Sequence, residues 1–172
     1  MTPRKPQKIT PIFKTQHNKK LLSIFLKLTN KLNQIGITPI TYGSLGLSLL
    51  IGEHSRINDI DLILTDTDFS NHWGIINMVI MDKLGYKLDS RHWQEFNGNN
   101  IPVSFIKLSD IQKLTPINTD QLKKEKIGKA TYYNLSLPQY LDIYKNGLHN
   151  KYRKQGKGRD DKEKISLVEQ HL

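Results

Sequence analysis

Cysteine is absent from this 172-residue chain. Its absence excludes a disulfide framework, a thiolate zinc site and a thiol nucleophile. A chain of roughly 150 residues buries about two thirds of its unfolded surface on folding, so this one needs no cross-link for stability. The lack of cysteine is typical of a reducing cytoplasm, although many secreted bacterial proteins also lack it.

Long apolar runs are also missing. The most apolar windows are Leu21–Leu28 and Leu45–Ile51, and both are much shorter than the roughly 20 residues that cross a bilayer. The basic start of the chain is not followed closely by an apolar region or by a small-residue cleavage site, so we expect no signal peptide. We therefore expect a soluble, cytoplasmic protein without a membrane partner. The sequence does not indicate its oligomeric state.

Acidic residues are scarce beside basic ones. Lysine and arginine total 26 and aspartate and glutamate 16, which gives a formal net charge of +10. A basic domain favours a polyanionic partner such as RNA, DNA or nucleotide phosphate. Ordinary solvated lysines would produce the same excess, so the charge is compatible with both interpretations.

The composition divides the chain into three parts, although its length predicts a single domain. Residues 1–18 are basic and proline-containing and have no acid, so we expect a flexible arm. Residues 19–136 form the expected core. Residues 137–172 form an expected C-terminal helical segment that packs on this core.

Apolar periodicity predicts helices and strands in alternation. A first helix begins after an Asn18 cap and ends at Gly36. Further helices are expected at 45–51, 69–84 and 138–152 and after Gly158, and strands at 37–42, 57–65, 86–89, 92–96, 101–108 and 131–135. The Asn97-Gly98 pair predicts a hairpin, and residues 109–128 are expected to be loop with a short helical piece. The fold class is therefore α/β (α+β), a mixed β-sheet flanked by helices.

Two aspartates stand out within the second predicted strand. Asp59 and Asp61 are two residues apart, and such residues point to the same face of a sheet. Hard cations such as Mg²⁺ prefer carboxylate oxygens, whereas the same two carboxylates would repel each other without a cation. The pair therefore predicts a site for Mg²⁺, with Mn²⁺ as an alternative. Asp-x-Asp on a strand could also be a solvated face.

Gly43 and Ser44 follow the first predicted strand and open a short helix. Glycine lets the backbone approach a ligand closely, and the N–H groups at a helix start favour an anion. The Ser44 hydroxyl could contact a phosphate or act only as the helix N-cap. A phosphate-binding turn beside a metal-binding strand suits phosphoryl or nucleotidyl transfer.

Tyr-Gly-Ser-Leu-Gly at 42–46, followed by Asn-Asp-Ile-Asp-Leu at 58–62, resembles the signature of the nucleotidyltransferase superfamily that includes DNA polymerase β. The pattern is most similar to small bacterial branches, the antibiotic nucleotidyltransferases and those of abortive-infection toxin–antitoxin systems. The resemblance implies transfer of a nucleoside monophosphate from an NTP to an acceptor hydroxyl. The basic ends of the chain make tRNA or another nucleic acid the candidate acceptor.

The same resemblance implies basic residues at the triphosphate. Arg56 precedes the two aspartates, and the C-terminal segment supplies Lys145, Arg153 and Lys162. In enzymes of this kind such a segment packs beside the sheet and directs basic side chains toward the phosphates. A solvated lysine face on a terminal helix would give the same pattern.

The sequence departs from the superfamily at one position. The resemblance implies a third carboxylate, a general base or second metal ligand, on a later strand, but Ser104 occupies the position where an acid is expected. Glu95 and Asp89 lie on neighbouring predicted strands and could replace it, and Glu95 is preferred because its strand pairs with that of Ser104. Without such a base the chain would be a catalytically weak nucleotide- or RNA-binding module, or a toxin–antitoxin-related one.

Overall fold

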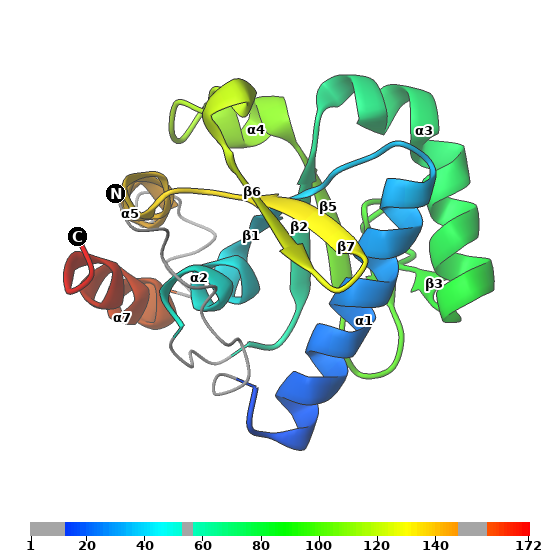
Figure 1. The fold of residues 1–172 in the computed structure, drawn as a ribbon, viewed down its shortest axis with the longest axis horizontal. Helices are drawn as coiled ribbons and strands as arrows, with labels where there is room; N and C mark the ends of the chain where they lie inside the picture. Colours follow the sequence, from blue (N-terminus) through cyan, green and yellow to red (C-terminus); the bar gives the residue numbers. More distant parts are fainter. Residues whose placement is uncertain (1–12, 53–56, 148–157) are drawn as a thin grey trace.

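The computed structural model describes residues 13–52, 57–147 and 158–172 (Figure 1). Its α-helices are α1 (Gln16–Gln34), α2 (Gly43–Ile51), α3 (Asp66–Met78), α4 (Leu108–Gln112), α5 (Leu137–Gly147) and α7 (Gly158–Glu169). A π-helix, η1 (Val79–Lys83), continues α3, and a 3-10 turn, η2 (Thr119–Gln121), follows α4. The strands are β1 (Ile40–Tyr42), β2 (Ile60–Leu64), β3 (Lys87–Leu88), β4 (Glu95–Asn97), β5 (Val103–Lys107), β6 (Lys123–Ile127) and β7 (Ala130–Asn134).

The strands form one seven-stranded sheet in the order β3-β4-β5-β2-β1-β7-β6. The central strand β2 is antiparallel to β1 and parallel to β5, and β1 is parallel to β7. The outer pairs β3–β4, β4–β5 and β6–β7 are antiparallel. Helices lie on both sides of the sheet (Figure 1), so the expected mixed sheet flanked by helices is confirmed.

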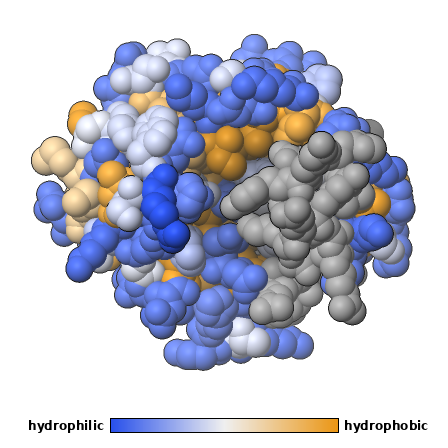
Figure 2. All heavy atoms as spheres, turned by 180° about the vertical axis from the view of Figure 1, so that it is seen from behind, coloured by the Kyte–Doolittle hydropathy of each residue, from blue (hydrophilic) through white to orange (hydrophobic). Residues whose placement is uncertain are grey.

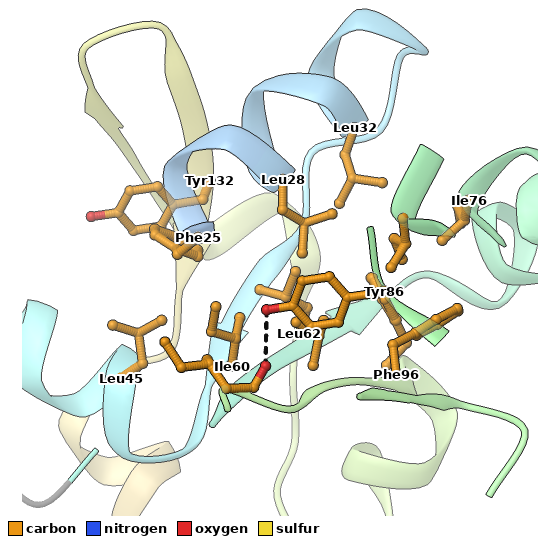
Figure 3. Close-up of a cluster of buried hydrophobic side chains, with 14 of the residues drawn as sticks. Phe25, Leu28, Leu32, Leu45, Ile60, Leu62, Ile76, Tyr86, Phe96 and Tyr132 are labelled. Atoms are coloured by element: carbon orange, nitrogen blue, oxygen red, sulfur yellow. Dashed lines mark hydrogen bonds between the residues drawn. The ribbon is translucent and has the colours of Figure 1, made fainter. Parts of the chain in front are cut away.

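Alternation along β2 separates the two faces of the sheet. Ile60, Leu62 and Leu64 are buried in the core that includes α1 and α3, as Figure 3 shows for the first two. Ile63 belongs instead to a second core with α2 and α5. Since residues two apart share a face, Asp61 lies on the side of the second core.

The second core covers only part of its face. Leu47 of α2 and Tyr140 and Ile143 of α5 are buried there beside Ile63. Toward β4 the face becomes more accessible along one row of side chains, since Ser104 of β5 is half-buried and Glu95 of β4 is exposed. The sheet therefore presents a more accessible row beside the covered region.

The first helix begins earlier than its apolar pattern indicates. Its N-cap is Thr15, whose side-chain oxygen accepts a hydrogen bond from the backbone N–H of Asn18 at 3.1 Å. The expected Asn18 cap is therefore wrong. Asn18 is one of the buried residues of α1.

Strand β6 was expected to be loop, and that expectation is wrong. Residues 123–127 pair with β7 through a turn at Gly128, which has φ of 58°. β6 is the edge strand of the sheet, and edge strands often carry lysines that discourage pairing with other chains. The lysines remove the apolar alternation that identifies a strand in a sequence.

The hairpin expected at Asn97-Gly98 is present between β4 and β5. Its left-handed residues, however, are Asn99 and Asn100, with φ of 55° and 58°. Gly98 has a different role, because a Cβ there would lie 2.9 Å from the Tyr86 ring. The glycine therefore makes room for a core aromatic side chain.

A buried polar network fixes α2 to the sheet and to α5. The Asn134 side-chain amide donates to the Gly46 carbonyl at 2.8 Å, and the Tyr140 hydroxyl donates to Asn134 Oδ1 at 2.9 Å. A Cβ on Gly46 would overlap the Tyr140 hydroxyl and lie 3.0 Å from the Thr41 backbone carbon. Glycine at this position therefore lets α2 pack closely on β1.

Replacing Gly46 with alanine tests this close packing. We expect Gly46→Ala to lower the free energy of unfolding by about 1–3 kcal/mol, since overpacking a filled site costs that much. Gly74→Ala is the matched control, because Gly74 lies exposed in α3 with nothing within 4 Å of an added Cβ. It should stabilise the protein by about 0.5–1 kcal/mol through helix propensity. Urea unfolding measures both, and equal effects of the two substitutions would contradict the packing argument.

Candidate active site

The turn from β1 into α2 lies directly against Asp61. Tyr42, the last residue of β1, is the register partner of Asp61 on β2. Gly43 follows with φ of 67°, and a Cβ at this position would lie 2.5 Å from Asp61 Oδ2. Both the backbone angle and the lack of space require glycine here. The expected proximity of the glycine turn and the second aspartate is therefore present in the structure.

Ser44 is the second residue of α2 and is buried. The N-cap position is occupied by Tyr42, which makes no side-chain capping hydrogen bond. Ser44 is therefore not the N-cap, and that alternative is wrong. The first N–H groups of an α-helix have no intrahelical partner and favour anions, so the start of α2 is chemically suited to a phosphate beside Asp61.

Asp59 lies just ahead of β2 and is half-buried. Its spacing from Asp61 places both on one face if the chain is extended between them. Within the described ranges, no three His, Asp or Glu side chains gather closely enough to hold a metal ion. Two carboxylates still fit Mg²⁺, which is usually held by one or two carboxylates together with waters and substrate phosphates.

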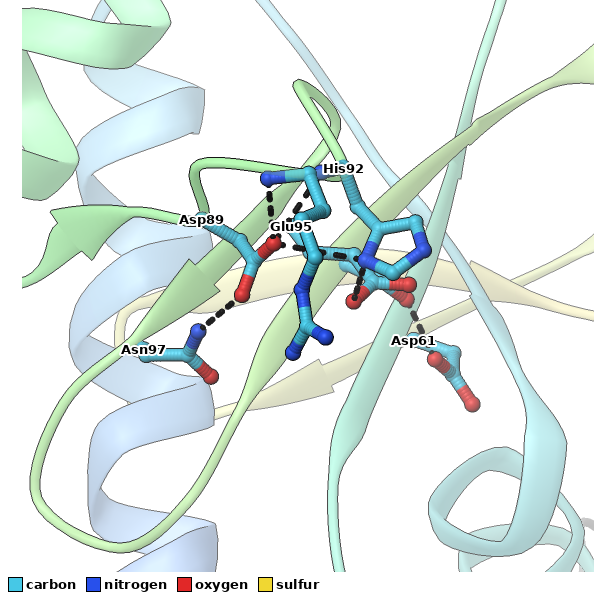
Figure 4. A network of polar contacts seen from close by, with 7 residues as sticks. Asp61, Asp89, His92, Glu95 and Asn97 are labelled. Atoms are coloured by element: carbon cyan, nitrogen blue, oxygen red, sulfur yellow. Dashed lines mark hydrogen bonds and ion pairs between the residues drawn. The ribbon is translucent and has the colours of Figure 1, made fainter.

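A row of polar side chains crosses the sheet beside the turn. Asp61 pairs in register with Ser104 of β5, and Ser104 pairs with Glu95 of β4. The Ser104 hydroxyl donates to Asp61 Oδ1 at 2.5 Å (Figure 4). Adjacent strands lie about 4.8 Å apart, so the backbones of Asp61 and Glu95 are separated by about 10 Å. Asp61, Ser104 and Glu95 therefore form one row across three strands on the same face of the sheet.

Glu95 and Asp89, the two candidates for the missing acid, have different surroundings. Glu95 is exposed, and its Oε2 lies 3.6 Å from His92 Nδ1. Asp89 accepts hydrogen bonds from the backbone N–H groups of Arg91 and His92 at 2.8 and 3.0 Å and from the Asn97 amide at 2.8 Å (Figure 4). The hydrogen bond from Arg91 is the largest of the effects that lower the Asp89 pKa. Asp89 thus fixes the loop between β3 and β4, and Glu95 is the acid in the row with Asp61.

Of the four basic residues expected at the site, the structure describes Lys145 and Lys162. Lys145 of α5 forms an ion pair with Glu169 of α7 at 2.9 Å between Nζ and Oε1. Lys162 is exposed on α7. Arg56 and Arg153 lie outside the described residues. A role of these four residues at a triphosphate stays a prediction.

A groove of about 370 Å³ adjoins the row at its Glu95 end. It is lined by the loop that precedes β4 and by the neighbouring part of β5, including Arg91, His92, Trp93, Glu95, Ser104 and Ile106. Sequence reasoning did not single out Arg91 or Trp93. The only signal available was their position just before Glu95 in the sequence. Figure 2 shows one face of the protein, which is mostly hydrophilic and has a patch of apolar side chains in the upper part of the view.

The fold is similar to that of a solved nucleotidyltransferase-like protein. The crystal structure of an antigenic nucleotidyltransferase-like protein from Paracoccidioides brasiliensis matches with a TM-score of 0.56 and 14% sequence identity. The match covers 87% of this chain and 75% of that chain. The protein therefore has a nucleotidyltransferase-like fold, which confirms the fold implied by the Gly-Ser and Asp-x-Asp motifs.

The sequence also has a clear bacterial relative. The uncharacterized protein YnaI of Bacillus subtilis (strain 168) is 30% identical over 150 residues, which cover 87% of this chain and 96% of YnaI. The chain belongs to the same family as YnaI. No protein-family model matches the sequence of this chain. Among the described residues, no helix has the length and apolar character needed to cross a membrane.

Substituting Ser104 tests whether its position belongs to the site. We expect Ser104→Asp to lower the Tm without Mg²⁺, because two adjacent carboxylates repel each other. Adding Mg²⁺ should raise the Tm of this variant more than that of the wild type, since a bound cation stabilises the folded state. Ser104→Ala is the control, because it removes the hydroxyl without adding charge. An equal response to Mg²⁺ in both variants would show that position 104 does not share a cation with Asp61.

Proposed function

We propose that this protein is a Mg²⁺-dependent nucleotidyltransferase that moves a nucleoside monophosphate from an NTP to an acceptor hydroxyl. The observation that carries the proposal is the contact between the Gly43 turn and the Asp61 carboxylate within a nucleotidyltransferase-like fold. A fold alone does not assign an activity. The proposal therefore depends on the residues of the turn and of β2.

The turn would bind the phosphates of the NTP. Gly43 lets the Asp61 carboxylate lie close to the turn, and the N–H groups at the start of α2 favour negative charge. The Ser44 hydroxyl lies in the same first turn of the helix. The close packing of α2 at Gly46 holds this anion site in a fixed position relative to Asp61.

Asp59 and Asp61 would hold the metal ion. Both supply the hard carboxylate oxygens that Mg²⁺ and Mn²⁺ prefer. When bound, the ion would supply positive charge at the phosphate oxygens. The hydrogen bond from Ser104 to Asp61 Oδ1 orients the Asp61 carboxylate, because it occupies one of the lone pairs of that oxygen.

Glu95 would act as the general base. In the transfer, the acceptor oxygen forms a bond to the α-phosphorus, the bond from that phosphorus to the bridging oxygen breaks, and pyrophosphate leaves. The acceptor proton passes to the Glu95 carboxylate, which shares a face and a row with Asp61. A positioned base of this kind accelerates reactions by about 10²–10⁴-fold.

A second candidate function is that of a catalytically weak module that binds nucleotide or RNA. Such a module could be a component of a toxin–antitoxin system. The hydroxyl of Ser104, where the superfamily pattern has an acid, favours this candidate. The distance across two strands to Glu95 also favours it, because a base must come within hydrogen-bonding reach of the proton. Both candidate functions use the same phosphate and metal site, but only the transferase turns over substrate at an appreciable rate.

A transfer assay distinguishes the two candidates. With NTPs labelled at the α-phosphate and total RNA as acceptor, wild-type protein and Mg²⁺ should produce labelled RNA. Asp61→Asn should reduce the signal to background, and Glu95→Gln should lower the rate by about 10²–10⁴-fold. Glu125→Gln is the control, because Glu125 lies on β6 at the opposite edge of the sheet. Full activity of the Asp61→Asn variant would contradict the proposed transferase site. Full activity of the Glu95→Gln variant would contradict the assignment of Glu95 as the general base.

A further inference from the structure

We infer that the groove beside Glu95 binds the terminal nucleotide of a single-stranded nucleic acid, which makes it the acceptor subsite. This inference rests on the proposed function, because it names the acceptor of the same site. The groove, of about 370 Å³, includes Ser104 and Glu95 in its lining. It is at the small end of the range for ligand sites, roughly 300–1,000 Å³, which suits one nucleotide unit.

An exposed aromatic residue, Trp93, is among those that line this groove. Trp93 is 53% exposed, which is unusual for so large an apolar side chain. The centroid of its ring lies 5.5 Å from those of Phe69 and Trp73, and both contacts are edge-on. The indole is therefore held against rings of the core on the α3 side of the sheet, at the rim of the groove, while part of it remains open to solvent. Held aromatic rings of this kind are the platforms on which bases of single-stranded nucleic acids stack.

A cation lies two residues before the indole. Arg91 is exposed, and its backbone N–H donates to Asp89. In the described part of the chain, no carboxylate forms an ion pair with the Arg91 guanidinium. Guanidinium groups bind phosphate through paired hydrogen bonds, so Arg91 is suited to the phosphate of an incoming strand.

The loop that carries these groups is fixed before any ligand binds. Asp89 accepts backbone hydrogen bonds from both Arg91 and His92, and the Asn97 amide donates to the same carboxylate. A loop held in this way loses little entropy on binding. The net charge of +10 adds attraction for a polyanion. A cationic acceptor is disfavoured, because it would lie against the Arg91 guanidinium.

Tryptophan fluorescence tests the subsite without requiring turnover. The chain has two tryptophans, Trp73 and Trp93. A short single-stranded oligoadenylate without NTP or metal should quench the emission of the wild type, and Trp93→Phe should lose that quenching. In fluorescence anisotropy with a labelled oligonucleotide, Trp93→Ala should weaken binding by about fivefold or more. Arg91→Ala should weaken it by about tenfold or more.

Lys126→Ala is the matched control for Arg91→Ala. Each substitution removes one exposed positive charge, but Lys126 lies on β6 at the far edge of the sheet. Equal weakening by both would mean binding to diffuse charge and would overturn the subsite. Unchanged quenching in Trp93→Phe would overturn it as well. So would quenching by a serine- or tyrosine-containing peptide but not by the oligonucleotide, since the acceptor would then be a protein.

The proposal of the acceptor subsite and the proposal of transferase activity can be contradicted independently of each other. Asp61→Asn should bind the oligonucleotide as well as the wild type does, although it should not transfer nucleotides. Oligonucleotide binding at the groove by a protein that never transfers would support the subsite and count against the transferase alone. Transfer to another acceptor without oligonucleotide binding would overturn the subsite alone.

Discussion

The approach of the Gly43 backbone to the Asp61 carboxylate is the contact on which the rest of the site depends. It exists because β1 and β2 are antiparallel and pair Tyr42 with Asp61, so that the chain leaving β1 turns directly over the aspartate. A Cβ on Gly43 would lie 2.5 Å from Asp61 Oδ2, and φ at this residue is 67°. The same turn begins α2, so one glycine brings a helix start and a carboxylate together. The candidate anion site and the candidate cation site are thus neighbours.

The sheet extends this arrangement toward one edge. On the β1 side, α2 and α5 cover the face. Hydrogen bonds and close packing among Gly46, Asn134 and Tyr140 join these two helices. On the other side, Ser104 of β5 is half-buried and Glu95 of β4 is exposed, and the two continue the row that begins at Asp61. The groove beside β4 is therefore the candidate route by which a substrate would approach the carboxylates.

Much of this could be predicted from the sequence where a local pattern decides the structure. The run around Asp59 and Asp61 alternates apolar and acidic residues, which fixes both the strand and its faces. Gly43 was recognisable because a tight turn from a strand into a helix often needs the backbone freedom of glycine. β6 was missed, because the lysines that protect a sheet edge remove the apolar alternation. The Asn18 cap was wrong because Thr15, ahead of the apolar pattern, competes for the same role.

Properties that depend on strand pairing could be predicted only in part. The preference for Glu95 over Asp89 followed from the expected pairing of two neighbouring strands, and the register places Glu95 opposite Ser104. The hydrogen bonds that occupy Asp89 depend on the conformation of a short loop, which composition does not determine. The groove with Arg91 and Trp93 combines this loop with β5, so no single stretch of sequence indicates it.

The central claim is that Asp59, Asp61 and the Gly43 turn form one site for a metal–nucleotide complex. Isothermal titration calorimetry of NTP binding, with and without Mg²⁺, tests it most directly when wild type is compared with the Asp59→Asn/Asp61→Asn double variant. We expect the wild type to bind NTP in a Mg²⁺-dependent manner and the double variant to lose that dependence while remaining folded. Equal Mg²⁺-dependent binding by both proteins, or none by the wild type, would contradict the account.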